Sequence, residues 1–143
     1  MARKVYDSPY PTSERQPMHG QMVAVMNLKT DKWNNELIEP RSQAIRKTEI
    51  HELVVTSEKE AGPGGIVQKA AFLGFFEVKL GGLLVNGDQL RIGDRPIGKV
   101  VGFNTIHMPN HLNIVIQVTD IKHGQELGLH IGYPLTFLPE SVT

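Results

Sequence analysis

The sequence predicts an all-β protein, a small antiparallel Greek-key-like β-barrel with at most one or two short helices. Segments in which apolar and polar residues alternate recur along the chain, and this period of two is typical of strands. Residue pairs that favour tight turns separate these segments at close spacing. Almost no stretch has the apolar spacing of a helix, so we expect several short strands in one domain.

Residues 1–20 are predicted to form an extended or disordered arm ahead of a single barrel domain over residues 21–143. The arm is rich in proline, which lacks a backbone N–H group and fixes φ. We expect it to make few contacts with its own barrel. It is either a loose terminus or an arm that packs on a neighbouring subunit through Tyr6 and Tyr10, and the second interpretation predicts a homo-oligomer.

The first part of the barrel domain is predicted to contain a strand, a short helix and a second strand. Gln21–Asn27 is predicted to be the first strand. Glu39–Lys47 is the one helix candidate, because its proline suits the first position of a helix. Thr48–Ser57 is rich in β-branched residues and is predicted to be a strand. In that strand we expect His51 to be a hydrogen-bonded core residue whose tautomer is fixed by Glu49.

Glycine marks the turns in the middle of the chain. Glu58–Gly65 is predicted to be a loop, and Ile66–Leu80 a long strand in which Gly74 permits a bulge or a bend. The Asn-Gly pair at 86–87 and the Gly-Asp pair at 93–94 indicate tight turns between short strands.

The clearest strand signal is Leu112–Thr119, and Tyr133–Leu138 is predicted to be the last strand. Because side chains alternate between the two faces of a strand, Leu112–Thr119 has one mostly apolar face and one mixed face. We expect the apolar face to fill the barrel core, so the mixed face lies on the outer wall. The apolar face carries Leu112, Ile114, Ile116 and Val118, and the mixed face carries His111, Asn113, Val115 and Gln117.

Length and composition exclude several classes of protein. The 143 residues fit one domain, and 15 basic residues balance 15 acidic ones, so we expect no nucleic-acid partner. The absence of cysteine excludes disulfides, thiolate metal sites and thiol catalysis. No apolar stretch approaches the roughly 18 residues of a membrane span, and the start lacks the apolar core of a signal peptide. We therefore expect a cytoplasmic protein with no membrane partner.

The segment Gly81–Phe103 (GGLLVNGDQLRIGDRPIGKVVGF) has the most regular glycine pattern in the chain. It resembles the glycine framework of the glucitol/sorbitol-specific IIA component of the bacterial sugar phosphotransferase system. The resemblance covers about residues 66–138 and implies a compact Greek-key-like β-barrel. Phe75–Glu77 stands where that family has its phosphoacceptor histidine, and Asn113 stands near its second histidine. The resemblance therefore implies the barrel framework without the phosphocarrier chemistry.

The segment NTIHMPNHLN, residues 104–113, concentrates polar residues between two apolar strands. Pro109 argues against a helix, so we expect a loop at the barrel rim, where loops commonly carry function. Burying such groups without a role is costly. The candidate catalytic residues are His107, His111 and Asn113, and the candidate ligand-binding residues are Asn110, Gln117 and Glu52.

Three interpretations of this segment remain open at the level of sequence. His107, His111 and a carboxylate such as Glu52 or Glu77 could form a metal site, although the favoured site contains no metal and no cofactor is identified. The Asn and His side chains could instead satisfy backbone groups of the loop. The third interpretation is a metabolic enzyme whose histidine acts as acid and base on a small polar metabolite. A non-catalytic ligand-binding or regulatory barrel, or an oligomeric assembly protein, is the alternative function.

Overall fold

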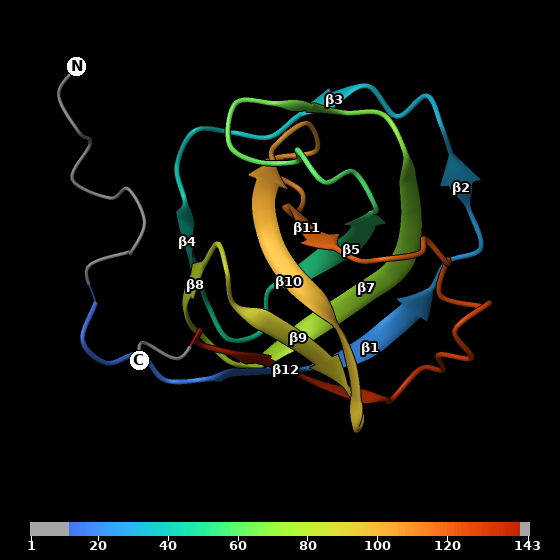
Figure 1. Cartoon of the computed structure of the whole chain (residues 1–143). Coiled ribbons are helices and arrows are strands. Elements are labelled where there is room, and N and C mark those ends of the chain that lie inside the picture. The colour runs from blue at the N-terminus through green and yellow to red at the C-terminus, as the bar shows by residue number, and fades with distance from the viewer. Residues whose placement is uncertain (1–11, 141–143) are drawn as a thin grey trace, which may run out of the picture.

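The computed structural model describes residues 12–140, and all of their regular secondary structure is β (Figure 1). The prediction of an all-β protein is confirmed. The predicted contacts of Tyr6 and Tyr10 lie outside the described residues. Across those residues, no helix has the length and apolar character needed to cross a lipid bilayer.

The largest sheet contains eight strands, and its pairing order returns to the strand where it starts. The order is β1-β12-β9-β10-β11-β5-β7, and β7 pairs with β1 again. Strand β2 (Lys29–Thr30) follows β1 and pairs with the first residues of β7, Ala70 and Ala71. The ring strands are β1 (Met18–Val25), β5 (Ile50–Thr56), β7 (Ala70–Leu80), β9 (Gln89–Ile92), β10 (Arg95–Asn104), β11 (Asn113–Gln117) and β12 (Pro134–Leu138).

Two short strand pairs complete the structure. Strand β3 (Asn35–Glu36) pairs with β6 (Ile66–Val67), and β4 (Ser42–Ile45) pairs with β8 (Gly82–Val85). The helix predicted over Glu39–Lys47 is therefore wrong. An isolated short helix is marginal in water, whereas pairing with β8 satisfies the backbone of β4 and buries Ile45.

One pairing departs from the antiparallel arrangement that the sequence predicted. Strands β11 and β5 are parallel, with Asn113 opposite Glu52 and Gln117 opposite Thr56. Parallel neighbours need a long crossover connection, and the chain between β5 and β11 supplies one by forming β6 to β10. The segments that follow β5 and β11 consequently leave the ring at the same edge.

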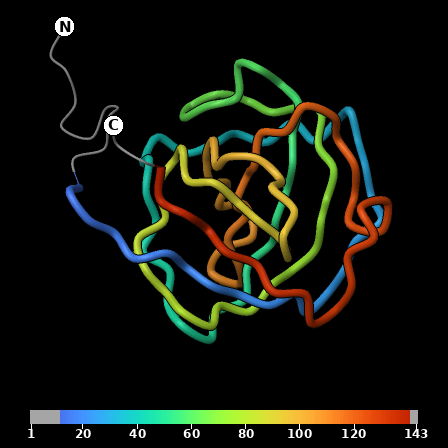
Figure 2. The backbone as a smooth tube through the Cα atoms, turned by 60° about the horizontal axis from the view of Figure 1, so that its bottom comes forward, coloured from blue at the N-terminus to red at the C-terminus, as the bar shows by residue number. Residues whose placement is uncertain are grey.

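The interior of the ring is filled by apolar side chains from every ring strand, and Figure 2 shows the backbone winding around this core. Ile114 and Ile116 belong to it, so the predicted inward face of β11 is confirmed. Val115 points the other way and packs in a second cluster with Leu37 and Val54. Both faces of β11 are therefore buried, and the segments that carry β3 and β6 cover part of the outer wall.

Gly74 is the bend that the sequence predicted in the long strand β7. Its φ is 145°, and a Cβ there would collide with the carbonyl oxygen of Ala24. The registers of β7 with β1 and with β5 both shift near this residue. Glycine lets β7 curve and pair with strands on both of its sides.

The predicted arm joins the sheet earlier than expected. Strand β1 begins at Met18, and the Arg15 guanidinium donates two hydrogen bonds to the carboxylate of Asp88, at 2.7 and 2.6 Å. Arg15 also donates to the carbonyl of Leu83, and Gln16 donates to that of Gly81. The prediction of few contacts is therefore wrong for these residues, because the local turn gives the buried Asp88 carboxylate the amide of Val85 as a donor, whereas its cation comes from Arg15.

Replacing Arg15 with methionine is expected to lower the free energy of unfolding by about 3 kcal/mol, since it leaves the buried Asp88 carboxylate without its cation. Chemical denaturation measures this loss. The control is Arg91→Met at an exposed arginine, where a change below about 0.5 kcal/mol is expected. Equal small losses in both variants would contradict a structural role for the Arg15–Asp88 pair.

Candidate functional site

Four of the six predicted site residues come together on the outer wall of the ring, near the start of β11. They form the His111 cluster, which consists of Glu52, His107, Asn110 and His111. Asn113 lies directly behind the cluster in β11. Gln117 lies at the opposite end of that strand and takes no part in it.

Both ring nitrogens of His111 have hydrogen-bonding partners. The Nε2 atom lies 3.3 Å from Oε1 of Glu52, and Nδ1 lies 2.7 Å from Oδ1 of Asn110. Glu52 is buried on β5, while Asn110 is exposed in the loop. The imidazole therefore has an inner nitrogen on a buried carboxyl group and an outer nitrogen on an exposed amide.

Two aromatic contacts fix the plane of the His111 ring. Phe75 on β7 packs against it edge to face, with 4.9 Å between ring centroids. His107 stacks on it at the same centroid distance and an interplanar angle of 27°. The sequence singled out Phe75 only as the residue in the place of a phosphoacceptor. No pattern in the sequence revealed its contact with His111, because that contact depends on the register of β5 with β7.

The loop brings the two histidines together without a helix, as the position of Pro109 predicted. The amide of Met108 donates to the carbonyl of Thr105, and the amides of Asn110 and His111 both donate to the carbonyl of His107. These turn bonds fold the segment back on itself, so that His107 covers His111. His107 remains exposed, whereas only 13 % of the His111 side chain is accessible to solvent.

Burial controls the protonation of the Glu52–His111 pair. Desolvation raises the pKa of Glu52 to about 7, and its one side-chain hydrogen bond within residues 12–140 is the one with His111. Desolvation, followed by the nearby His107 and His51, lowers the pKa of His111. Near neutral pH the Glu52 carboxyl is therefore about half protonated, and in its protonated form it donates to a neutral imidazole.

His51 has the structural role that the sequence predicted. Its Nδ1 accepts a hydrogen bond of 3.0 Å from the amide of Leu112, so its Nε2 carries the proton and donates to Oε1 of Glu49 at 3.2 Å. This bridge ties β5 to the residue that follows His111. His51 thereby helps to position the loop without belonging to the His111 cluster.

Asn113 supports the loop from behind. Its Nδ2 group donates to Oδ1 of Asn104, and Nδ2 of Asn104 donates to the carbonyl of Glu36. The Oδ1 atom of Asn113 is buried and has no hydrogen-bonding partner in the described part of the chain. Asn113 therefore braces the base of the loop and keeps one unused acceptor.

The metal site that the sequence left open is not formed. Among residues 12–140, no group of three His, Asp or Glu side chains is placed to hold a metal ion. Glu77, one of the two carboxylates considered, contacts the ammonium group of Lys79 at 2.9 Å.

The profile of DUF6917, described as a family of unknown function, matches residues 12–138. The chain belongs to the DUF6917 family. No curated protein and no solved structure matches the chain. The DUF6917 match includes the whole ring and the whole His111 cluster, whereas the resemblance to the phosphotransferase component stays a prediction.

Replacing Glu52 with glutamine is expected to stabilise the protein at pH 8 but not at pH 4. Because the pKa of Glu52 rises from 4.5 to about 7 on folding, its contribution is complete below 4.5 and is lost as the pH rises toward 7. At pH 8 we expect a gain of about 3 kcal/mol in the free energy of unfolding, and at pH 4 almost none.

The control for this comparison is Glu60→Gln, at an exposed position. Urea denaturation at the two pH values measures both variants. A gain from Glu52→Gln that is the same at pH 4 and pH 8 would contradict a buried carboxyl group with a raised pKa.

Proposed function

We propose that this chain is a cytoplasmic metabolic enzyme in which the His111 cluster transfers a proton to or from a small polar metabolite. In this proposal His111 contacts the metabolite, and Glu52 is the buried proton partner of His111. His107 and Asn110 form the exposed side of the site, where the metabolite enters.

One observation carries the proposal: the two nitrogens of His111 face different environments. The inner nitrogen contacts a buried carboxyl group, and the outer nitrogen contacts an exposed, neutral amide. A polar group of a metabolite can replace the Asn110 amide at Nδ1 while the contact with Glu52 is retained. A histidine that is oriented by a carboxyl group at one nitrogen, and whose other nitrogen contacts only an exposed side chain that a ligand can replace, is an effective acid–base group.

The proton balance of the pair allows transfer in both directions. With Glu52 ionised, Nε2–H donates to the carboxylate, and the lone pair of Nδ1 takes a proton from the metabolite. With Glu52 protonated, Nδ1–H gives its proton to the metabolite, and the carboxyl proton moves to Nε2. Because the pKa of Glu52 is about 7, both forms are accessible near neutral pH.

A screen of small polyols, sugars and hydroxy acids tests the proposal. We expect a metabolite that raises the Tm of the wild-type protein to bind His111→Gln at least about tenfold more weakly. The Tm of His111→Gln without ligand is expected to stay within about 4 °C of wild type, which corresponds to about 1 kcal/mol.

The matched control is His19→Gln, because His19 is an exposed histidine whose Nδ1 contacts Thr136 on another part of the ring. This control is expected to bind the metabolite as the wild-type protein does. Full binding by His111→Gln, or a large loss of stability with binding intact, would show that the cluster has only a structural role.

A further inference from the structure

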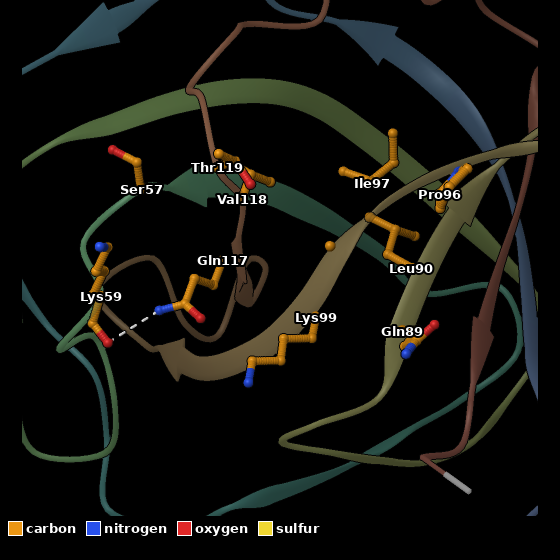
Figure 3. A pocket seen from close by; sticks show the side chains of 11 residues that line it. Ser57, Lys59, Gln89, Leu90, Pro96, Ile97, Lys99, Gln117, Val118 and Thr119 are labelled. Carbon is orange, nitrogen blue, oxygen red and sulfur yellow. Dashed lines mark hydrogen bonds between the residues drawn. The ribbon is translucent and has the colours of Figure 1, made fainter.

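A recess of about 520 Å³ lies at the end of the ring opposite to the His111 cluster, beside the ends of β5 and β11 (Figure 3). A smaller hollow of about 250 Å³ adjoins it and shares the wall formed by Pro96–Ile97 and Val118–Thr119. Volumes of this order are typical of sites for small organic ligands.

The parallel pairing and one glycine create this recess. Because β5 and β11 end at the same edge, two walls of the recess are formed by Ser57 with Lys59 and by Val118 with Thr119. Gly98 on β10 lies against the carbonyl oxygen of Gln117, where a Cβ would collide with it. The registers of β10 shift on both sides of this glycine, so the strand bends around the recess.

Gln117 holds one wall of the recess in place. Its Nε2 group donates to the carbonyl of Glu58 at 2.9 Å and to that of Lys59 at 3.3 Å. These bonds tie the loop that follows β5 to β11. The sequence prediction that Gln117 shares the site of His111 is therefore wrong, and Gln117 belongs to a different cavity.

The recess combines positive charge with an apolar surface. Figure 3 shows Lys59 and Gln117 on one side, and Pro96 and Ile97 on the other. Lys59 and Lys99 are exposed and form no ion pair within residues 12–140, and no acidic side chain lines the recess. Among the described residues, the charged side chains on its wall are thus the ammonium groups of Lys59 and Lys99.

We propose that this recess binds a small organic anion, with a carboxylate or phosphate head group at Lys59 and Lys99 and an apolar body against Ile97 and Val118. The volume suits a metabolite-sized molecule. The site is separate from the His111 cluster and does not depend on the function proposed for that cluster.

Fluorescence titration with 1-anilinonaphthalene-8-sulfonate, an anion with an apolar body, tests the proposal. N-phenyl-1-naphthylamine has the same ring system without the charge. Lys59→Gln/Lys99→Gln is expected to bind the anionic probe about tenfold more weakly than wild type and the neutral probe equally well. Added salt is expected to weaken the binding of the anionic probe and to leave the binding of the neutral probe unchanged. Hexanoate, hexyl phosphate and hexanol share one alkyl chain and differ in the head group. The compound that displaces the anionic probe at the lowest concentration identifies the preferred head group.

Two further variants make the result decisive. Lys32→Gln/Lys47→Gln removes the same charge from exposed positions elsewhere and is expected to bind like wild type, as is His111→Gln. The proposal is overturned if the wild-type protein does not bind the anionic probe. It is also overturned if Lys59→Gln/Lys99→Gln binds that probe as tightly as wild type, or if Lys32→Gln/Lys47→Gln loses as much affinity.

Discussion

The parallel pairing of β5 with β11 is the constraint on which both candidate sites depend. Its register sets Asn113 opposite Glu52 and thereby brings the buried carboxyl group to His111, the residue two positions before Asn113. At the other end, Gln117 lies opposite Thr56, and the segments that follow form the walls of the recess. A shift of one residue would turn Glu52 and Asn113 toward the apolar core of the ring.

Buried polar groups gather at this pairing, and they cost stability unless they are satisfied. Asn104 and Asn113 bond to each other, and His51 is bonded at both ring nitrogens. Glu52 differs, because the single side-chain hydrogen bond that it forms with residues 12–140 is to another titratable group, His111. The Glu52–His111 pair is therefore the place where the fold tolerates an unfavourable buried charge. Buried titratable groups of this kind are common at functional sites.

The sequence predicted the features that depend on local alternation and turn chemistry. It identified the inward face of β11, the bend at Gly74 and the bridge between Glu49 and His51. It also located most of the polar cluster, since burying His and Asn side chains between apolar strands is costly.

Features that depend on pairing between distant segments could not be predicted in this way. Strand β4 carries no strong period of its own and forms because β8 is available to pair with it. The contact between Phe75 and His111 follows from the order of β7, β5 and β11 in the ring. Gln117 shares a face with His111 in the sequence pattern, but the length of β11 separates the two side chains. Periodicity describes which face a residue occupies and not which neighbour it meets.

The protonation of the Glu52–His111 pair is the central claim, and nuclear magnetic resonance measures it directly. The experiment follows the side-chain carboxyl carbon of Glu52 and the ring nitrogens of His111 across pH. The account predicts that the Glu52 carboxyl titrates near pH 7 and that the His111 ring is still neutral when a free histidine is half protonated, at about pH 6.5. Titration of Glu52 near 4.5 together with an independent titration of His111 near 6.5 would contradict it.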